Sequence, residues 1–215
     1  MAITAANLAD RAAYELKDTG HTNWSEAELI VYINEAVRHV VKRIAAMWPD
    51  AWPRFGENYE DTQNIVADTA NYDLPSDFYM MLRVKLTDSD GDTSLLEPIS
   101  LEREDDSDED DGYLLLNDDI YLYPTPDTSV TSGLTLWYIS LPPEAGSTDS
   151  VPLSTWFEDS IKEYVVVKAK ARQEEKTGDF GAFYRMVERD MEPFIAKMNA
   201  SEDEVGVNVL WRQWI

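Results

Sequence analysis

The spacing of apolar residues changes twice along this chain, and that change constrains the fold more than any other feature. Leu29, Ile33 and Val37 recur every four residues, as on one face of a helix, and a helical period returns after residue 155. Between these ends, Leu82 and Val84 alternate with basic residues, as in a strand with one buried face. Neither an all-helical nor an all-strand architecture accommodates both periods, so the sequence predicts the α+β class.

Start and stop signals predict two helices in the N-terminal region. The first is expected over residues 4–18, with Thr4 as its cap. The second begins at the capping box Ser25-Glu26-Ala27-Glu28, where a hydroxyl and a carboxylate each bond a free backbone N–H. Its apolar stripe runs to about Met47, and Pro49 then interrupts the pattern.

Two further helices are predicted over about residues 155–176 and 179–198, and an acidic break, Ser201–Glu204, follows them. The remaining segment, Val205–Ile215, is apolar and carries two tryptophans. Chains usually end in polar, frayed segments, and Trp and Arg are common interface anchors. The tail is therefore predicted to dock on another protein; the alternative is that it returns as a strand to the chain's own β region. The proposed contact residues are Val207, Val209, Leu210, Trp211, Arg212, Trp214 and Ile215.

The middle of the chain, residues 62–141, contains about five short strand-like runs with turn signals between them. A hairpin is predicted to turn at Asn117–Asp119. The predicted fold is a four-helix bundle, two helices from each end of the chain, with an inserted small antiparallel β domain and an extended C-terminal tail. The bundle is assigned to residues 1–60 and 150–200, the β domain to 61–149 and the tail to 201–215.

The charge balance excludes one large class of function. The chain has 42 Asp and Glu against 18 Lys and Arg, a formal net charge of −24. Such a surface repels phosphates, so a protein that grips DNA or RNA is not expected, although DNA could still slide past it. Lysine is scarce, which is typical of proteins that work in concentrated salt; the hypothesis is a halophilic source, and the alternative is an acidic mesophile.

No catalytic, cofactor-binding or metal-binding residue is predicted. The sequence lacks GxSxG, GK[ST] phosphate-loop, HExxH and GxGxxG motifs, and it has no cysteine. Its two histidines, His21 and His39, are interpreted as solvated loop and helix residues. No apolar run is long enough to cross a membrane and no signal peptide is recognised, so no membrane contact is expected.

Two acidic runs have competing interpretations. Asp88-Ser89-Asp90-Gly91-Asp92 superficially resembles a calcium loop, but its glycine comes one ligand early, so an acidic hairpin tip is favoured. Residues 102–111 hold eight acids in ten positions, which is typical of a mobile, hydrated loop. The functional alternative is an electrostatic surface that faces DNA or is neutralised by bound cations.

Several segments resemble a known family in the same order along the chain. They are Asp18–Ala36, which contains Asn23-Trp24-Ser25-Glu26-Ala27-Glu28-Leu29, then Asn71–Phe78, Val151–Asp159 and Lys168–Ala171. These segments are similar to the head-to-tail adaptor, or connector, proteins of tailed viruses. The resemblance spans most of the chain and fits the helix–β–helix organisation.

The resemblance implies a structural role in the neck of a virion, without enzymatic activity or a cofactor. Such adaptors usually assemble as a dodecamer beneath the portal protein and join it to a downstream tail protein, after synthesis in the host cytoplasm. Their C-terminal segment commonly reaches the portal, which would make Trp211, Trp214 and Ile215 anchors in apolar portal pockets. Arg212 would pair with a portal carboxylate. An acidic ring lumen would let the genomic DNA pass without binding.

Two other functions compete with the adaptor. One is an acidic binding module, cation-dependent or mimicking DNA, that uses residues 102–111. The other is a hydrolase with an Asp/Glu pair, which needs two carboxylates about 5–10 Å apart in a cleft. The sequence does not reveal such a distance.

Overall fold

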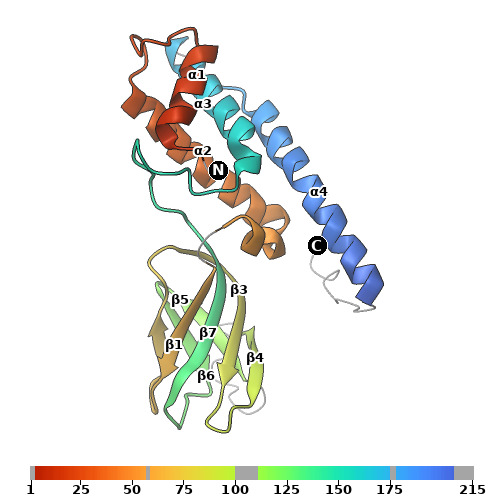
Figure 1. Cartoon of the computed structure of the whole chain (residues 1–215). Coiled ribbons are helices and arrows are strands. Elements are labelled where there is room, and N and C mark those ends of the chain that lie inside the picture. The colour runs from red at the N-terminus through yellow and green to blue at the C-terminus, as the bar shows by residue number, and fades with distance from the viewer. Residues whose placement is uncertain (1–2, 57–58, 100–110, 175–177, 206–215) are drawn as a thin grey trace. The chain divides into compact units, whose positions relative to one another are not determined.

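A computed structural model describes residues 3–56, 59–99, 111–174 and 178–205, with only the backbone described at residue 54 and at 194–205. The chain divides into two compact units. A helical unit comprises residues 1–55 and 143–215, and a sheet unit comprises residues 56–142 (Figure 1). In the described residues, no helix is long and apolar enough to span a membrane.

The described residues of the helical unit form four α-helices and two short 3₁₀ helices. They are α1 (Ala5–Glu15), α2 (Glu26–Met47), η1 (Pro49–Arg54), η3 (Thr155–Phe157), α3 (Glu158–Gln173) and α4 (Gly181–Val205). Thr4 and Ser25 cap these helices as predicted, since Thr4 Oγ1 accepts a hydrogen bond from Asn7 N and Ser25 Oγ accepts one from Glu28 N. The Glu28 carboxylate of the predicted capping box accepts a bond from the Tyr32 hydroxyl. Pro49 opens η1 directly after α2 ends, as expected for a residue that cannot continue the α2 ladder.

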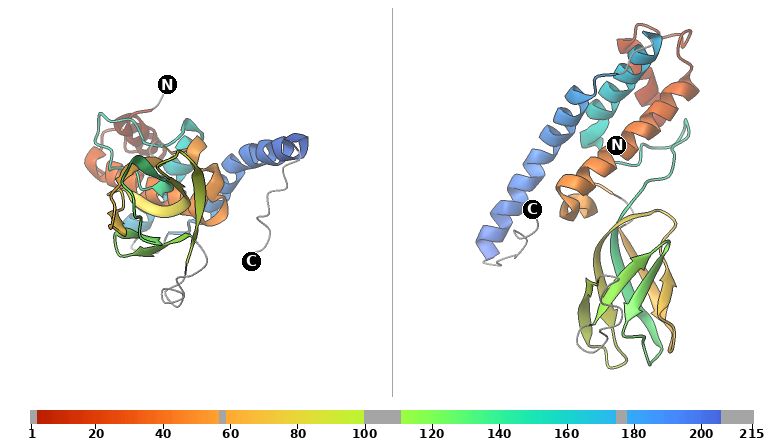
Figure 2. Two further views of the ribbon diagram at one scale, coloured as in Figure 1. Left: turned by 90° about the horizontal axis from the view of Figure 1, so that it is seen from below. Right: turned by 180° about the vertical axis from the view of Figure 1, so that it is seen from behind.

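The helices do not form the predicted four-helix bundle. α1, α2 and α3 pack against one another, whereas α4 packs mainly along α3 and its last turns extend past it (Figures 1 and 2). The core of this unit is made of fully buried side chains, among them Leu8, Leu29, Ile33, Ile44, Trp52, Phe157 and Phe183. α4 contributes Phe183, Val187 and Met191 to this core, while the rest of its length does not close a bundle with α1.

α4 is also longer than predicted. It continues through Pro193 and through Ser201–Glu204, the segment interpreted as a break, and ends at Val205. The acidic segment contains neither glycine nor proline, and glutamate is a good helix former, so charge alone does not end the helix. Residues 206–215, which hold the predicted docking side chains, lie outside the described part of the chain.

The sheet unit contains seven strands in one curled sheet. They are β1 (Glu60–Ile65), β2 (Asn71–Asp73), β3 (Phe78–Thr87), β4 (Thr93–Pro98), β5 (Gly112–Leu116), β6 (Asp119–Tyr123) and β7 (Val130–Ser140). Their order across the sheet is β1-β7-β3-β4-β5-β6-β2. Neighbours are antiparallel except β4 and β5, which pair in parallel through Glu97 with Gly112 and Pro98 with Tyr113.

The prediction of a small antiparallel β domain inserted in a bundle is therefore wrong. The sheet is large and mixed, and it has its own core of buried side chains, among them Val84, Ile120, Leu122, Leu134 and Leu136. β1 escaped notice because Ile65 is its only apolar residue, so the alternating burial of the strand leaves no hydrophobic pattern in the sequence. β4 escaped notice because five of its six side chains are exposed.

Side-chain bonds draw the two edge strands of the sheet together. Gln63 of β1 donates a hydrogen bond from Nε2 to the carbonyl oxygen of Asp73 in β2, at 2.8 Å. The Tyr72 hydroxyl bonds both the N–H and the carbonyl of Val66, at 3.2 and 3.3 Å, and the carbonyl of Thr69 at 3.0 Å. The sheet consequently curls around its apolar interior and resembles a small barrel when seen from its end (Figure 2, left).

Candidate interaction surfaces

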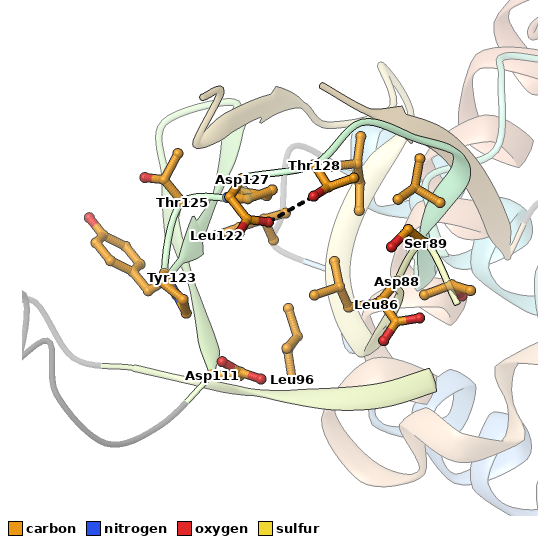
Figure 3. Close-up of a pocket in the computed structure, with 15 residues that line it drawn as sticks. Leu86, Asp88, Ser89, Leu96, Asp111, Leu122, Tyr123, Thr125, Asp127 and Thr128 are labelled. Carbon is orange, nitrogen blue, oxygen red and sulfur yellow. Dashed lines mark hydrogen bonds between the residues drawn. The ribbon is translucent and has the colours of Figure 1, made fainter. Parts of the chain in front are cut away.

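A cavity of about 400 Å³ opens at one end of the sheet unit (Figure 3). It lies where β3 ends and the β6–β7 connection crosses. Side chains of β3, β4 and β6 line it together with that connection. Leu86, Leu96 and Leu122 point into it and form an apolar floor. Leu96 and Leu122 are almost fully buried, which makes this floor continuous with the core of the sheet.

Acidic side chains surround this apolar floor. Asp88 lies on the β3–β4 turn, Asp111 directly before β5, and Asp127 on the β6–β7 connection (Figure 3). None of the described residues that line the cavity is basic. The cavity thus combines an apolar interior with a negatively charged rim, and the sequence did not predict it because closure of the sheet brings these segments together.

The segment Asp88–Asp92 is the tip of the β3–β4 hairpin, as predicted. The Asp88 carboxylate accepts hydrogen bonds from the backbone N–H groups of Asp90 and Asp92, both at 2.9 Å. Gly91 has φ of 87°, a conformation that favours glycine. The carboxylate therefore orders the turn itself. Among the described residues no cluster of acids or histidines is suited to hold a metal ion. Residues 102–110 of the longer acidic run lie outside the description.

In the helical unit, the turn between α1 and α2 is organised around one carboxylate. Asp18 is buried and accepts hydrogen bonds from the backbone N–H groups of Thr22, Asn23 and Trp24, at 2.8 to 3.0 Å. These bonds, that of Trp24 above all, lower the pKa of the Asp18 carboxyl. Asp18 thus holds a loop in shape, and it places Trp24 in the core beside the start of α2.

The two histidines occupy different environments. His21 Nε2 lies 3.0 Å from Asp10 Oδ1, and this hydrogen bond raises the pKa of His21. His39 is half-buried among the rings of Tyr164, Phe183 and Tyr184, with ring centroids 5.2 to 6.4 Å away. Burial lowers the pKa of His39, so the interpretation of this residue as a solvated helix histidine is wrong.

Basic side chains of the helical unit pair with acids on neighbouring helices. Arg43 of α2 pairs with Glu188 of α4, and Lys168 of α3 lies 3.1 Å from Glu35 of α2. Lys162 of α3 also bonds Glu15 of α1, at 2.7 Å. These positive charges are engaged within the fold. The large excess of acid at the surface therefore sets the electrostatic potential that a partner or a nucleic acid encounters.

The comparison with known proteins gives one clear similarity. The family model described as "SU10 adaptor protein" matches residues 3–208, which includes both the helical and the sheet unit. No curated protein matches the chain.

Proposed function

This chain belongs to the family of SU10 adaptor proteins, and on that basis we propose that it is a structural protein of the virion that joins the portal to the tail. The observation that carries this proposal is the family match over residues 3–208, because it extends over both units and includes all of α4. The role is mechanical and needs no catalytic residue or cofactor.

We further propose that copies of the chain form a ring, with twelve as the expected number, beneath the portal. The net charge of −24 supports a ring that is assembled on a partner, because free subunits of this charge repel one another in dilute buffer. Salt, cations or the portal would screen or offset that repulsion. An acidic lumen would then let the genome pass, because it offers the phosphates no positive charge.

The docking contact with the portal is proposed to lie in the tail. In the described part of the chain α4 extends to Val205, and the apolar terminal residues follow it directly in the sequence. Trp211, Trp214 and Ile215 are the proposed anchors, and Arg212 is proposed to pair with a portal carboxylate. The contribution of Val207, Val209 and Leu210 would be apolar contact along the same segment.

The acidic, lysine-poor composition supports a further proposal, that the protein works in concentrated salt. At about 1 M salt the Debye length falls to about 3 Å, so the self-repulsion of this surface is largely screened. A thermal melt that shifts steadily upward from dilute buffer to molar salt is expected. A melting temperature that does not respond to salt would contradict the halophilic proposal and leave the adaptor role untouched.

Co-sedimentation with the portal ring of the same virus, in high salt, tests the adaptor role and the tail together. The variant Trp211→Ala/Trp214→Ala removes the proposed anchors, and Asn208→Ala/Gln213→Ala is a matched control within the same tail. We expect the wild type and the control to sediment with the portal and the tryptophan variant to remain in the supernatant. Binding by all three would show that the tail is not the anchor, and binding by none would contradict the adaptor role.

A further inference from the structure

The cavity at the end of the sheet unit plays no part in the tail docking proposed above. We propose that it is a second docking site, which binds a segment of another protein in which an apolar side chain is flanked by lysine or arginine. The proposal joins two features of the same place, an apolar floor and a rim of carboxylates (Figure 3).

The floor fits an apolar side chain. Leu86, Leu96 and Leu122 point into the cavity, and Ile65 and Val130 complete its apolar lining. Its volume of about 400 Å³ lies within the range of ordinary ligand pockets, which are mostly apolar with a few placed polar groups. A leucine or aromatic side chain that enters this space removes apolar surface from water on both partners, which is the main source of favourable free energy.

The rim selects the charge of the segment. Asp88, Asp111 and Asp127 stand around the opening, and no described lining residue is basic. A carboxylate has about four lone-pair sites. The two backbone bonds to Asp88 and the Thr128 hydroxyl bond to Asp127, at 3.0 Å, therefore leave both able to accept further donors. An acidic segment would be repelled, whereas lysine or arginine beside the apolar side chain would pair with the rim.

The rim is also held in place by the fold. The β3–β4 turn is closed by Asp88 N–H to the carbonyl of Asp92, at 2.9 Å. The carbonyl of Pro126, in the β6–β7 connection, accepts a bond from Asp68 N–H at 2.8 Å. A preformed site loses less conformational entropy on binding than a site that must order first. Phosphate-bearing ligands are disfavoured by the same carboxylates.

Disulfide trapping on the full-length chain tests this site, because the sequence has no cysteine of its own. Ser89→Cys places a thiol at the rim, since Ser89 is exposed and lines the cavity. Ser76→Cys is the matched control, an exposed serine before the start of β3 and so at the opposite end of that strand. Each variant is first checked by thermal melt, then equilibrated with a cysteine-bearing peptide in a buffer that holds a small thiol and its disulfide at a fixed ratio. The small disulfide is the oxidant, because exchange joins the protein and peptide sulfurs and releases two small thiols. Intact mass measures the fraction captured.

Four peptides separate the contributions: Cys-Gly-Arg-Leu-Arg, Cys-Gly-Glu-Leu-Glu, Cys-Gly-Arg-Ser-Arg, and a cysteine followed by residues 206–215 of this chain. We expect the Arg-Leu-Arg peptide to be captured at position 89 about tenfold more than each of the two altered peptides. Capture at position 76 should be lower and independent of the leucine. The further change Asp127→Asn should reduce capture at position 89 only.

Three results would overturn the proposal. Equal capture at positions 76 and 89 would mean that the peptide follows only the net charge of the protein. Equal capture of the leucine and serine peptides would mean that the apolar floor is not used. Preferred capture of the peptide with residues 206–215 would assign the cavity to the tail of a second copy. The first two results do not bear on portal binding. The third concerns where the tail docks, and co-sedimentation with the portal still measures the adaptor role separately.

Discussion

Replacement of Asn34 by alanine should destabilise the helical unit more than its small change in volume suggests. The Asn34 side chain, on α2, is buried and makes two bonds with one residue of the segment that precedes α3. Its Nδ2 donates to the carbonyl of Ala145 at 3.1 Å, and its Oδ1 accepts from the Ala145 N–H at 3.0 Å. The amide therefore pairs with the backbone of a segment that is more than a hundred residues away.

The expected cost follows from the two backbone groups that the Asn34→Ala variant leaves unpaired. An unsatisfied buried donor or acceptor costs about 1–3 kcal/mol, and there is one of each. Ala145 keeps an exposed fraction of 7%, so water recovers part of this loss, and we expect about 2–4 kcal/mol in total. Aspartate in the same place should also destabilise the unit, because one of its oxygens would face the Ala145 carbonyl.

Urea unfolding of the full-length chain, followed by far-ultraviolet circular dichroism, measures this change through the helices. Asn7→Ala is the matched control, since Asn7 is an exposed residue of α1 and its backbone, rather than its side chain, bonds Thr4. The control should lie within about 0.5 kcal/mol of the wild type. If the Asn34 variant unfolds at the same urea concentration as the control, the two hydrogen bonds between the Asn34 amide and Ala145 do not stabilise this unit, and the expected loss is wrong.

Three other perturbations have expected outcomes. Tyr72→Phe removes the hydroxyl that ties the β1–β2 turn, so the sheet unit should lose about 1–2 kcal/mol in urea unfolding. Asp10→Asn should lower the pKa of His21, measured by NMR titration, because the bond from Asp10 is the main cause of its raised value. The stability that this bond contributes is fully present below the unfolded pKa of about 6.5 and is lost as the pH rises through the folded pKa; an unchanged titration would contradict this. Gly133→Ala places a Cβ 2.8 Å from Ile65 Cδ1, so it should lower the free energy of unfolding by about 1–3 kcal/mol, and an unchanged free energy would show that the interior yields.

The helices were predictable because their signals are local. Thr4 and Ser25 cap α1 and α2 as their side chains indicate, and α2 ends at Met47 just before Pro49. Local signals failed where packing decides the outcome. The apolar positions of α4 do not tell that it packs mainly along α3 and less on α2, and they did not reveal that the helix continues through Ser201–Glu204.

The sheet was predicted only in part, because its register and closure are non-local. β3 and β7 alternate or are continuously apolar and were recognisable. β1 has a single apolar residue and β4 exposes five of its six side chains, so both carry little pattern. The parallel pairing of β4 with β5 depends on a connection that leaves no periodic trace in the sequence.

The same limit applies to the interaction surfaces. The docking role of the apolar segment Val205–Ile215 was proposed from its composition, because it carries two tryptophans, and it stays a prediction. The cavity was not, since Leu86, Leu96 and Leu122 read as ordinary core residues and Asp88, Asp111 and Asp127 read as ordinary acids of an acidic chain. Only the curled sheet brings the leucines beneath the aspartates.

Native mass spectrometry of the portal ring, saturated with this chain in volatile salt, tests the adaptor role most directly. We expect a complex that is heavier than the portal by a whole multiple of 24.5 kDa. Its copy number should match the symmetry of the portal, with a single dominant stoichiometry. The Trp211→Ala/Trp214→Ala variant should leave the mass of the portal unchanged. A wild-type sample that contains only free portal and free chain would contradict the proposal that this protein is the portal's adaptor.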